Sequence, residues 1–343
     1  MCKGALRVEA KKHIDLIDIL KGVAIISVLI CHSVIVYPVN LENVAWSNAL
    51  KTFVDSYQMP LFFMISGFLC SYKGNYGGYL LSRVKRILIP YAVFNTVALF
   101  LRVVGGSLVN RKMDFKSALF QFFFQGTSSG GYWFLYALFI ISAIAPLFSI
   151  ILKKNRFLGL PFIAACVVVS ALFDLPEICC LKSVVYYLTY FIAGMMLKGC
   201  DFEKIKDKRI VILAVSAVVF CLSFVPLRIY ADNVYSVAGI YISAFAASAF
   251  FASFFSLVKL PKFIKNQLMT SGKYSLQYYL LNAFLVTGLR WLVVTKAHIT
   301  TPALIVLILF AGSYIVSYLV SKYILDSNNF FRFLCGLKVQ KNK

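Results

Sequence analysis

The chain is poor in charged residues, and acidic residues are the scarcest of them. Only 14% of its 343 residues are charged, with 13 Asp and Glu against 35 Lys and Arg. A soluble globular domain carries about 25% charged residues, which excludes an ordinary water-soluble globule. With 61% hydrophobic residues and a mean hydropathy of +0.82, the composition predicts an all-α, polytopic membrane protein.

Residues that bind metals or form disulfides are also few or badly spaced. There are three His, and the nine Cys lack the spacing of metal ligands. Only the adjacent pair Cys179 and Cys180 is expected to face the outside of the cell, and neighbouring cysteines bridge poorly. We therefore expect no disulfide framework and no metal site. No aromatic and basic module accompanies the net charge of +22, which argues against nucleic acid as a partner.

Long apolar runs, by contrast, fill the chain. Windows of about 20 residues predict ten helices in a single domain, 1–343. They lie near 15–37, 53–71, 87–104, 132–152, 157–174, 184–198, 210–226, 234–257, 274–294 and 303–325. The first is too long and too charged for a cleaved signal peptide, so we expect a permanent helix. The segment 105–131 is either an amphipathic or re-entrant piece or an interfacial helix followed by a flexible loop.

The basic residues predict the topology. With a cytoplasmic N-terminus, 25 of the 35 Lys and Arg fall in inside segments and 7 in outside loops. This asymmetry follows the positive-inside rule and places both termini in the cytoplasm. Most of the net charge is then a topological signal, combined with attraction to the anionic lipids of the bilayer.

Two ionisable residues interrupt the first apolar run. Lys21 and His32 are eleven residues apart, so on a helix they share one face at a separation of about 16 Å. An ammonium in hydrocarbon costs about 2.5 to 3.5 kcal/mol, which makes the pair a starting hypothesis for an active site. The alternative is that Lys21 snorkels to the interface while His32 bonds a neighbouring helix.

Five sequence blocks carry a resemblance to a known family. In chain order they are IDILKGVAIISVLICH, QMPLFFMISGFL, SRVKRILIPY, YWFLYALFI and SGKYSLQYYLLN. Together they resemble the acyltransferase 3 family of integral membrane acyltransferases, and most of all its fucose 4-O-acetylase-like group. The resemblance implies transfer of an acyl group, usually acetyl from acetyl-CoA, to a sugar hydroxyl. It implies a glycan or lipid-linked sugar acceptor, no tightly bound cofactor, and a bacterial inner-membrane location.

The resemblance also assigns residues. Lys21 and His32 match the catalytic pair of the family, and the basic segment matches Arg83, Lys85 and Arg86. Gln58 and Asn282 stand where relatives often have His, so we expect hydrogen bonding there rather than proton transfer.

Elementary chemistry supports these roles. Acyl transfer to an alcohol needs a base, and His32 is the only His within an expected span. Asp18, three residues before Lys21, is spaced to orient it by an ion pair, or is simply an interfacial carboxylate. If His32 is structural, the next candidates are Asp18, Glu42 and Asp55.

The remaining candidates concern the two substrates, and each has a plainer alternative. Arg83, Lys85 and Arg86 can clasp the donor phosphates or merely flank a span. Ser66 suits close helix packing or substrate contact. Trp133 suits an interfacial belt or a sugar-stacking platform, and Arg290 suits snorkelling or acceptor binding.

Two further functions stay open at this point. Intramembrane charges also suit a transporter or flippase for a lipid-linked sugar, although the chain shows no compelling internal repeat. A non-catalytic subunit of a polysaccharide synthase is the third hypothesis. No motif specifies the acceptor sugar, whether the acyl group is acetyl or succinyl, or the oligomeric state.

Overall fold

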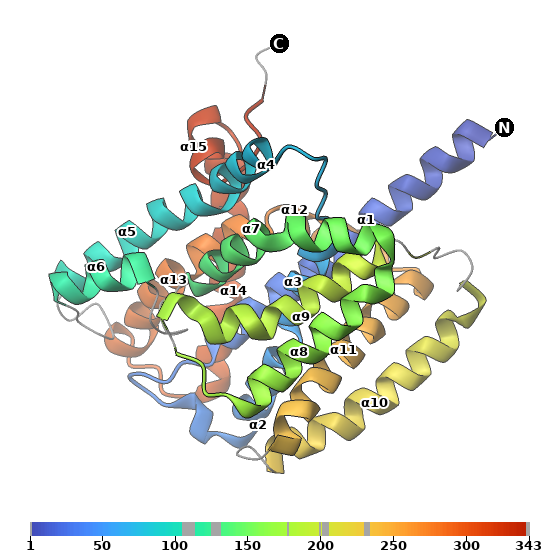
Figure 1. Ribbon diagram of the computed structural model, residues 1–343. Helices are drawn as coiled ribbons and strands as arrows, with labels where there is room; N and C mark the ends of the chain where they lie inside the picture. Colours follow the sequence, from blue (N-terminus) through green and yellow to red (C-terminus); the bar gives the residue numbers. More distant parts are fainter. Residues whose placement is uncertain are drawn as a thin grey trace.

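The computed structural model describes residues 2–104, 114–124, 132–176, 178–198, 200, 206–229 and 234–340, with only the backbone given for 2–14, 206, 225–229 and 234–236. Every regular element in these ranges is a helix, as the composition predicts (Figure 1). The long and medium helices are α1 (Cys2–Ser33), α2 (Ala45–Asp55), α3 (Gln58–Phe68), α4 (Tyr76–Arg83), α5 (Ile89–Val104), α6 (Phe115–Phe124), α7 (Trp133–Lys154), α8 (Gly159–Leu172), α9 (Leu181–Leu197), α10 (Arg209–Ile229), α11 (Val234–Leu257), α12 (Lys262–Lys273), α13 (Ser275–Arg290), α14 (Pro302–Val320) and α15 (Asn329–Leu334).

Helix covers most of each of the ten expected segments, but the helices differ in length. Among the described residues, seven helices are long and apolar enough to cross a membrane. They are Asp15–Ser33, Tyr76–Val104, Trp133–Lys154, Ile178–Leu197, Val237–Leu257, Ser275–Lys296 and Pro302–Leu325. Two more apolar helices are shorter, Arg156–Leu172 and Arg209–Phe224, and α3 has 11 residues.

The expected single helix over 53–71 is wrong. It is broken at Ser56 and Tyr57, so that α2 ends at Asp55 and α3 begins at Gln58. Pro60 accounts for the break, because in a continuous helix its ring would clash with the carbonyl of Ser56. In the first turn of α3, where no backbone N–H is needed, proline is tolerated.

Other expected boundaries also shift. The helix expected over 87–104 begins earlier, at Tyr76, where the Asn75 side chain caps it by accepting from the Gly78 amide at 2.9 Å. The first helix ends at Ser33, ahead of Pro38, which disfavours helical backbone at the residue before it. Of the segment 105–131 the structure describes α6, a helix with exposed Phe side chains. The rest of that expectation lies outside the described residues.

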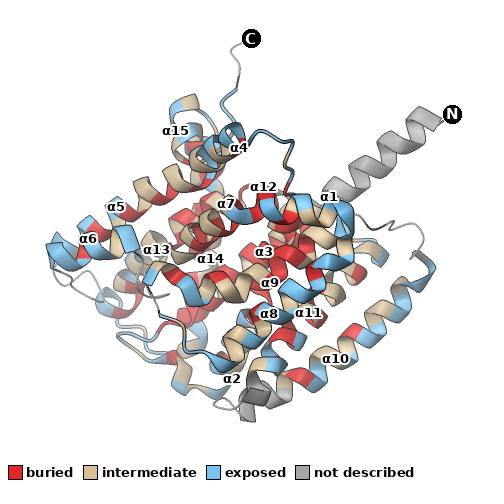
Figure 2. Cartoon of the chain, in the orientation of Figure 1, coloured by how far each residue is buried: buried red, intermediate tan, exposed pale blue. Residues whose placement is uncertain are grey.

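The bundle is apolar inside and out. Buried residues concentrate along α1, α3 and α9 at its centre (Figure 2). The periphery carries exposed large hydrophobic side chains, such as Leu222 at 70% and Phe263 at 73%. Such a surface suits a surrounding bilayer, and α1 lies in the interior in contact with α2, α3, α11, α12, α13 and α14.

Glycines allow two helix pairs to approach closely. A Cβ on Gly67 of α3 would lie 1.9 Å from the Phe191 carbonyl oxygen of α9, and one on Gly194 of α9 would lie 1.9 Å from the Met64 carbonyl oxygen. Gly22 of α1 and Gly272 of α12 are packed in the same way against backbone of the partner helix. Small residues thus set the spacing of the central helices.

Both ends of the chain lie at one end of the bundle. Asp15 of α1 bonds Lys265 of α12 at 2.7 Å, and Lys273 of α12 bonds Asp326, near α15, at 3.3 Å. Figure 1 shows α4, α12 and α15 at the same end as the C-terminus. We call it the basic end, because it carries Lys85, Arg86, Lys265, Lys273 and Arg332.

Candidate active site

The site is framed by two antiparallel helices, α1 and α3. Ser27 of α1 pairs with the Tyr57 hydroxyl, just before α3, at 2.8 Å. Nearer the basic end, Leu20 and Ala24 of α1 share a buried cluster with Leu61 of α3. Since α1 is helical throughout Cys2–Ser33, Lys21 stands near its basic end and His32 at its opposite end.

A pocket of about 170 Å³ opens beside Lys21. It is lined by Lys21, Met59, Phe62, Ile65, Ser66, Leu69, Arg86, Ile87, Phe134, Leu135, Leu138, Ser275, Leu276 and Tyr279. These residues come from all five sequence blocks, which the fold brings together although they are spread over most of the chain. Their positions in the sequence alone do not indicate that they line one pocket.

The pocket is elongated along α3. Met59, Phe62 and Ser66 of this helix and Leu69, which caps it, lie on one face at helical spacing, and the ten steps from first to last residue span about 15 Å. Apart from Lys21, Arg86 and the two serines Ser66 and Ser275, the lining consists of apolar and aromatic side chains. The pocket is therefore mostly apolar, with two cations in its wall.

An ion pair holds Lys21. Its ammonium lies 2.6 Å from the Asp18 carboxylate, which confirms the pairing expected from their spacing. Each of the two side chains is about a quarter exposed, at 24% and 25%, so the pair remains open to the pocket.

Of the three basic residues expected to hold the donor, Arg86 lines the pocket. The Arg83 guanidinium lies over the Tyr79 ring at 4.7 Å, and Lys85 is exposed; neither is among the pocket-lining residues that the structure describes. Arg83 is the last residue of α4, whereas Lys85 and Arg86 lie in η2 (Val84–Leu88), a π-helical turn between α4 and α5. Its wider turn changes the side-chain directions relative to a continuous α-helix, and such turns are frequent at functional sites.

His32 belongs to a polar cluster at the opposite end of α1. Asp55, the last residue of α2, accepts a hydrogen bond from the Cys31 thiol at 3.1 Å and another from the Gln58 amide. The charges of Asp55 and Lys51 both act on the His32 imidazole, which is accessible although it lies deep among protein atoms. We call these five residues, Cys31, His32, Lys51, Asp55 and Gln58, the His32 cluster.

The cation of this cluster is itself held by an ion pair. Burial opposes the charge on Lys51, but the hydrogen bond to Glu42 and the charges around it outweigh burial and raise its pKa above the ordinary value. Lys51 is therefore charged at neutral pH, and Glu42 is occupied as its partner.

Aromatic side chains connect the pocket with the surroundings of the His32 cluster. Phe134, in the pocket wall, packs on Tyr279 at 5.3 Å and on Phe63 at 5.1 Å between ring centroids. Phe63 stacks on Tyr187 at 4.4 Å, and Trp133 lies 5.3 Å from the same ring. Trp133 thus packs against the core rather than facing only lipid, and the Asp55 charge acts on Tyr187.

Comparison with known protein families gives one finding that decides the class. The acyltransferase 3 family, described as an acyltransferase domain, matches residues 14–322, nearly the whole chain. The chain belongs to the acyltransferase 3 family. No curated protein and no solved structure matches it. Family membership, together with the apolar helical bundle, makes this protein a membrane acyltransferase.

Two amides in this acyltransferase have open acceptors. The Gln58 Oε1 and Asn282 Oδ1 atoms are buried and accept no hydrogen bond within the described part of the chain. Asn282 follows the pocket residue Tyr279 by one helical turn of α13, so both lie on one face. A buried carbonyl oxygen without a donor is costly, and a hydroxyl of a bound substrate or a water would satisfy it.

Arg290 lies elsewhere in this acyltransferase. It is 4% exposed and donates to the Tyr37 carbonyl at 3.3 Å, with its guanidinium 5.6 Å from the centre of the Tyr37 ring. It fastens the loop that follows α1 and is not among the pocket-lining residues that the structure describes.

Sequence reasoning missed several site residues. Tyr279 and Tyr187 were hidden in aromatic-rich helices, and their only sequence signal is a Tyr-Tyr pair in each, at 278–279 and 186–187. Asp55 was considered only as a replacement for His32, not as its neighbour. No group of three His, Cys, Asp or Glu that could hold a metal occurs among the described residues.

Proposed function

We propose that this acyltransferase is an O-acetyltransferase that moves acetyl from acetyl-CoA to a hydroxyl of a glycan or lipid-linked sugar. One observation carries the proposal: five separate sequence blocks line a single pocket that has Lys21 and Arg86 at its basic end, while the same helix α1 carries His32. Cations at a mouth and a base farther in suit a donor with phosphates at one end and a reactive thioester at the other.

The donor lies along α3 in this proposal. Lys21 and Arg86 bind its phosphates, and the long acyl-carrying arm follows the apolar face of α3 toward Met59. From the level of Met59 to His32, α1 continues for about seven residues, or about 10 Å. The thioester and the acceptor hydroxyl meet in this interval, beside the His32 cluster.

The reaction needs one base and a charge partner. A His32 nitrogen takes the proton of the acceptor hydroxyl as its oxygen attacks the thioester carbonyl carbon. The new C–O bond forms, the C–S bond breaks, and the electron pair leaves with the coenzyme A sulfur, which takes up a proton. The Asp55 charge, which acts on the imidazole, stabilises the imidazolium that forms meanwhile.

The lining of the pocket favours acetyl over succinyl. At the inner end Met59 offers no partner for a second carboxylate, Lys51 of the His32 cluster is already paired with Glu42, and an unpaired charge in such surroundings is costly. An acetyl group adds only a methyl to the thioester carbonyl. We therefore expect purified protein in lipid to use acetyl-CoA at least about tenfold better than succinyl-CoA, a difference of about 1.4 kcal/mol.

The acceptor end suits a carbohydrate. The carbonyl oxygens of Gln58 and Asn282 accept hydrogen bonds from sugar hydroxyls, and Trp133, which packs on Tyr187 with one side, offers an aromatic face on which a sugar ring stacks. Amides that replace the imidazoles of relatives keep this hydrogen bonding and leave His32 as the base.

The experiment compares Arg86→Gln with Lys85→Gln. Both remove one positive charge from the same turn, but Arg86 lines the pocket and Lys85 does not. We expect Arg86→Gln to weaken acetyl-CoA binding about tenfold, which is the smallest loss typical of removing a charge-assisted hydrogen bond. The loss should be larger at low salt than at high salt, because salt screens the wild-type interaction. Lys85→Gln should change it less than twofold, roughly the size of a screened surface charge.

The same preparation decides the class of reaction. Folded wild-type protein in lipid should transfer radiolabelled acetyl to a glycan from a panel of bacterial surface polysaccharides and lipid-linked sugars. Equal effects of the two substitutions, or tight binding of acetyl-CoA without transfer to any member of the panel, would contradict the proposal.

A further inference from the structure

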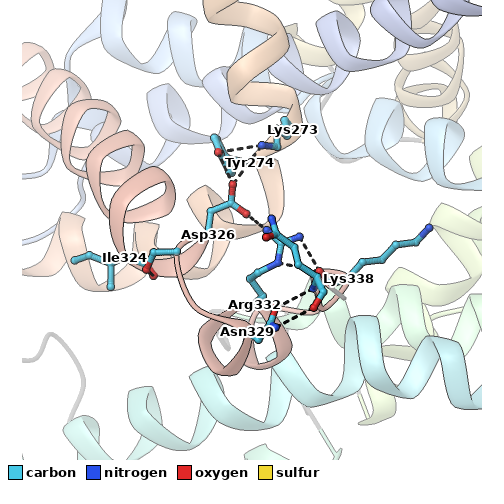
Figure 3. A network of polar contacts seen from close by, with 9 residues as sticks. Lys273, Tyr274, Ile324, Asp326, Asn329, Arg332 and Lys338 are labelled. Carbon is cyan, nitrogen blue, oxygen red and sulfur yellow. Dashed lines mark hydrogen bonds and ion pairs between the residues drawn. The ribbon is translucent and has the colours of Figure 1, made fainter. Parts of the chain in front are cut away.

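The chain after α14 closes on itself around one carboxylate. Asp326, which follows the π-helical turn η8 (Ser321–Leu325), accepts hydrogen bonds from the Tyr274 hydroxyl at 2.9 Å and the Lys273 ammonium at 3.3 Å (Figure 3). It also forms an ion pair with Arg332 of α15. Asp326 and Arg332 are only 17% and 14% exposed, so this pair is shielded from the solvent screening that weakens surface ion pairs.

The residues beyond α15 are tied to the same unit. The Arg332 guanidinium donates from Nε and Nη2 to the Lys338 carbonyl at 2.9 and 2.7 Å. Asn329 exchanges two hydrogen bonds with the Gln340 backbone, at 2.9 and 2.8 Å. Residues 326–340 therefore form one hydrogen-bonded unit, which we call the C-terminal clamp (Figure 3).

This clamp touches both walls of the pocket. On one side Asp326 holds Tyr274, and the next two residues, Ser275 and Leu276, line the pocket. On the other side Gly336 lies against η2, where a Cβ would be 2.4 Å from the Arg86 carbonyl oxygen and 2.9 Å from Pro90 Cγ. The backbone of Gly336 has φ +68°, which favours glycine and fixes the turn that brings it there.

We propose that the C-terminal clamp is a positioning device for donor binding, in which Asp326 and Gly336 hold the α13 wall and the η2 wall at the separation that lets Arg86 meet the phosphates of an acyl-CoA. The proposal rests on the proposed function. Its physical basis is that η2 is a π-helical turn, so the direction of Arg86 depends on what packs against its backbone. Neither Asp326 nor Gly336 lines the pocket among the described residues, so both act through others.

The first test compares Gly336→Ala with Gly74→Ala. Both glycines have positive φ, at +68° and +96°, so both substitutions strain the backbone. A Cβ at Gly74 meets nothing within 4 Å, whereas one at Gly336 meets the Arg86 backbone. We expect Gly336→Ala to raise the KM for acetyl-CoA about tenfold or more, the change that one charge-assisted hydrogen bond gives, with kcat within about twofold of wild type. Gly74→Ala should leave both unchanged.

A second variant keeps the test decisive if Gly336→Ala does not fold. Asp326→Asn removes the charge that Lys273 and Arg332 share, and should raise the same KM, while Asp326→Glu should restore part of the affinity. Acetyl-CoA binding measured directly by calorimetry on folded protein in lipid separates the two proposals. Wild-type protein that binds acetyl-CoA, with Asp326→Asn and Gly336→Ala binding equally well, overturns the clamp alone. Wild-type protein that does not bind acetyl-CoA overturns the clamp and the proposed function together.

Discussion

At His32 the imidazole is subject to two opposite charges. Asp55 and Lys51 both act on it, and Asp55 is held in place by Cys31 and Gln58. A carboxylate that is fixed by two donors cannot easily swing away, so its field on the imidazole is constant. Burial and the Lys51 charge oppose a positive imidazole, and the Asp55 charge favours it, so Asp55 is the group that stabilises the imidazolium formed when His32 accepts a proton.

Substitution of His32 tests its role as base. We expect His32→Ala and His32→Gln to lower acetyl transfer by about 10² to 10⁴, the usual cost of losing a general base, with acetyl-CoA binding unchanged. The measurement is transfer at matched levels of folded protein. His298→Asn serves as control, because His298 lies in an exposed loop with φ +50°, which Asn tolerates. Near-full turnover by either His32 variant would move the search to Asp18, Glu42 and Asp55.

The candidate residues that the sequence singles out are those whose setting is unusual on its own. Lys21 and His32 stand out because charge is rare in an apolar run, and the Asp18 pairing follows from helical spacing alone. Arg86 could not be distinguished from Lys85, because their directions depend on the π-helical turn of η2. That turn has no signal in residue type.

At the level of elements, the α2–α3 break is the feature that organises the His32 cluster. It places Asp55 at the end of one helix and Gln58 at the start of the next. A continuous helix would also bring these two residues close together, but it would point both side chains along one surface. Hydropathy windows hide such a break, since both halves are apolar. Pro60 was an available signal, because proline inside an expected span ends or kinks the helix before it. The signal is not decisive, since α7 continues through Pro146.

The close contact between α3 and α9 supports a prediction about stability. Gly67→Ala would place a methyl group 1.9 Å from the Phe191 carbonyl oxygen, so the two helices must separate. We expect a loss of about 1 to 3 kcal/mol, typical of overpacking, seen as a lower melting temperature of the protein in detergent. Gly288→Ala is the matched control, because a Cβ there meets nothing within 4 Å and Ala favours a helix by about 1 kcal/mol. Equal melting temperatures for the two variants would mean that α3 and α9 are less tightly packed than the structure shows.

For the whole molecule, the placement of charge links topology to catalysis. Asp15 of α1 and Asp326 are both bonded to α12, so the N-terminal and C-terminal parts of the chain meet at the same end of the bundle. That end also holds Lys21 and Arg86 at the pocket. If acyl-CoA enters from the cytoplasm, this basic end must face the cytoplasm, which is also the side that the distribution of 35 Lys and Arg predicts.

Cysteine labelling measures this orientation directly. Lys182 begins α9 and Lys208 follows its other end, and both are exposed. With the nine native cysteines replaced, we expect a membrane-impermeant maleimide to label Lys182→Cys in intact cells, and Lys208→Cys only after permeabilisation. Lys338→Cys, in the C-terminal clamp, should behave like Lys208→Cys, because it lies at the basic end. Labelling of the two test sites from the same side would show that α9 does not cross the membrane. The reversed pattern would place the pocket cations outside the cell, where no acyl-CoA reaches them, and would contradict the topology and the proposed donor together.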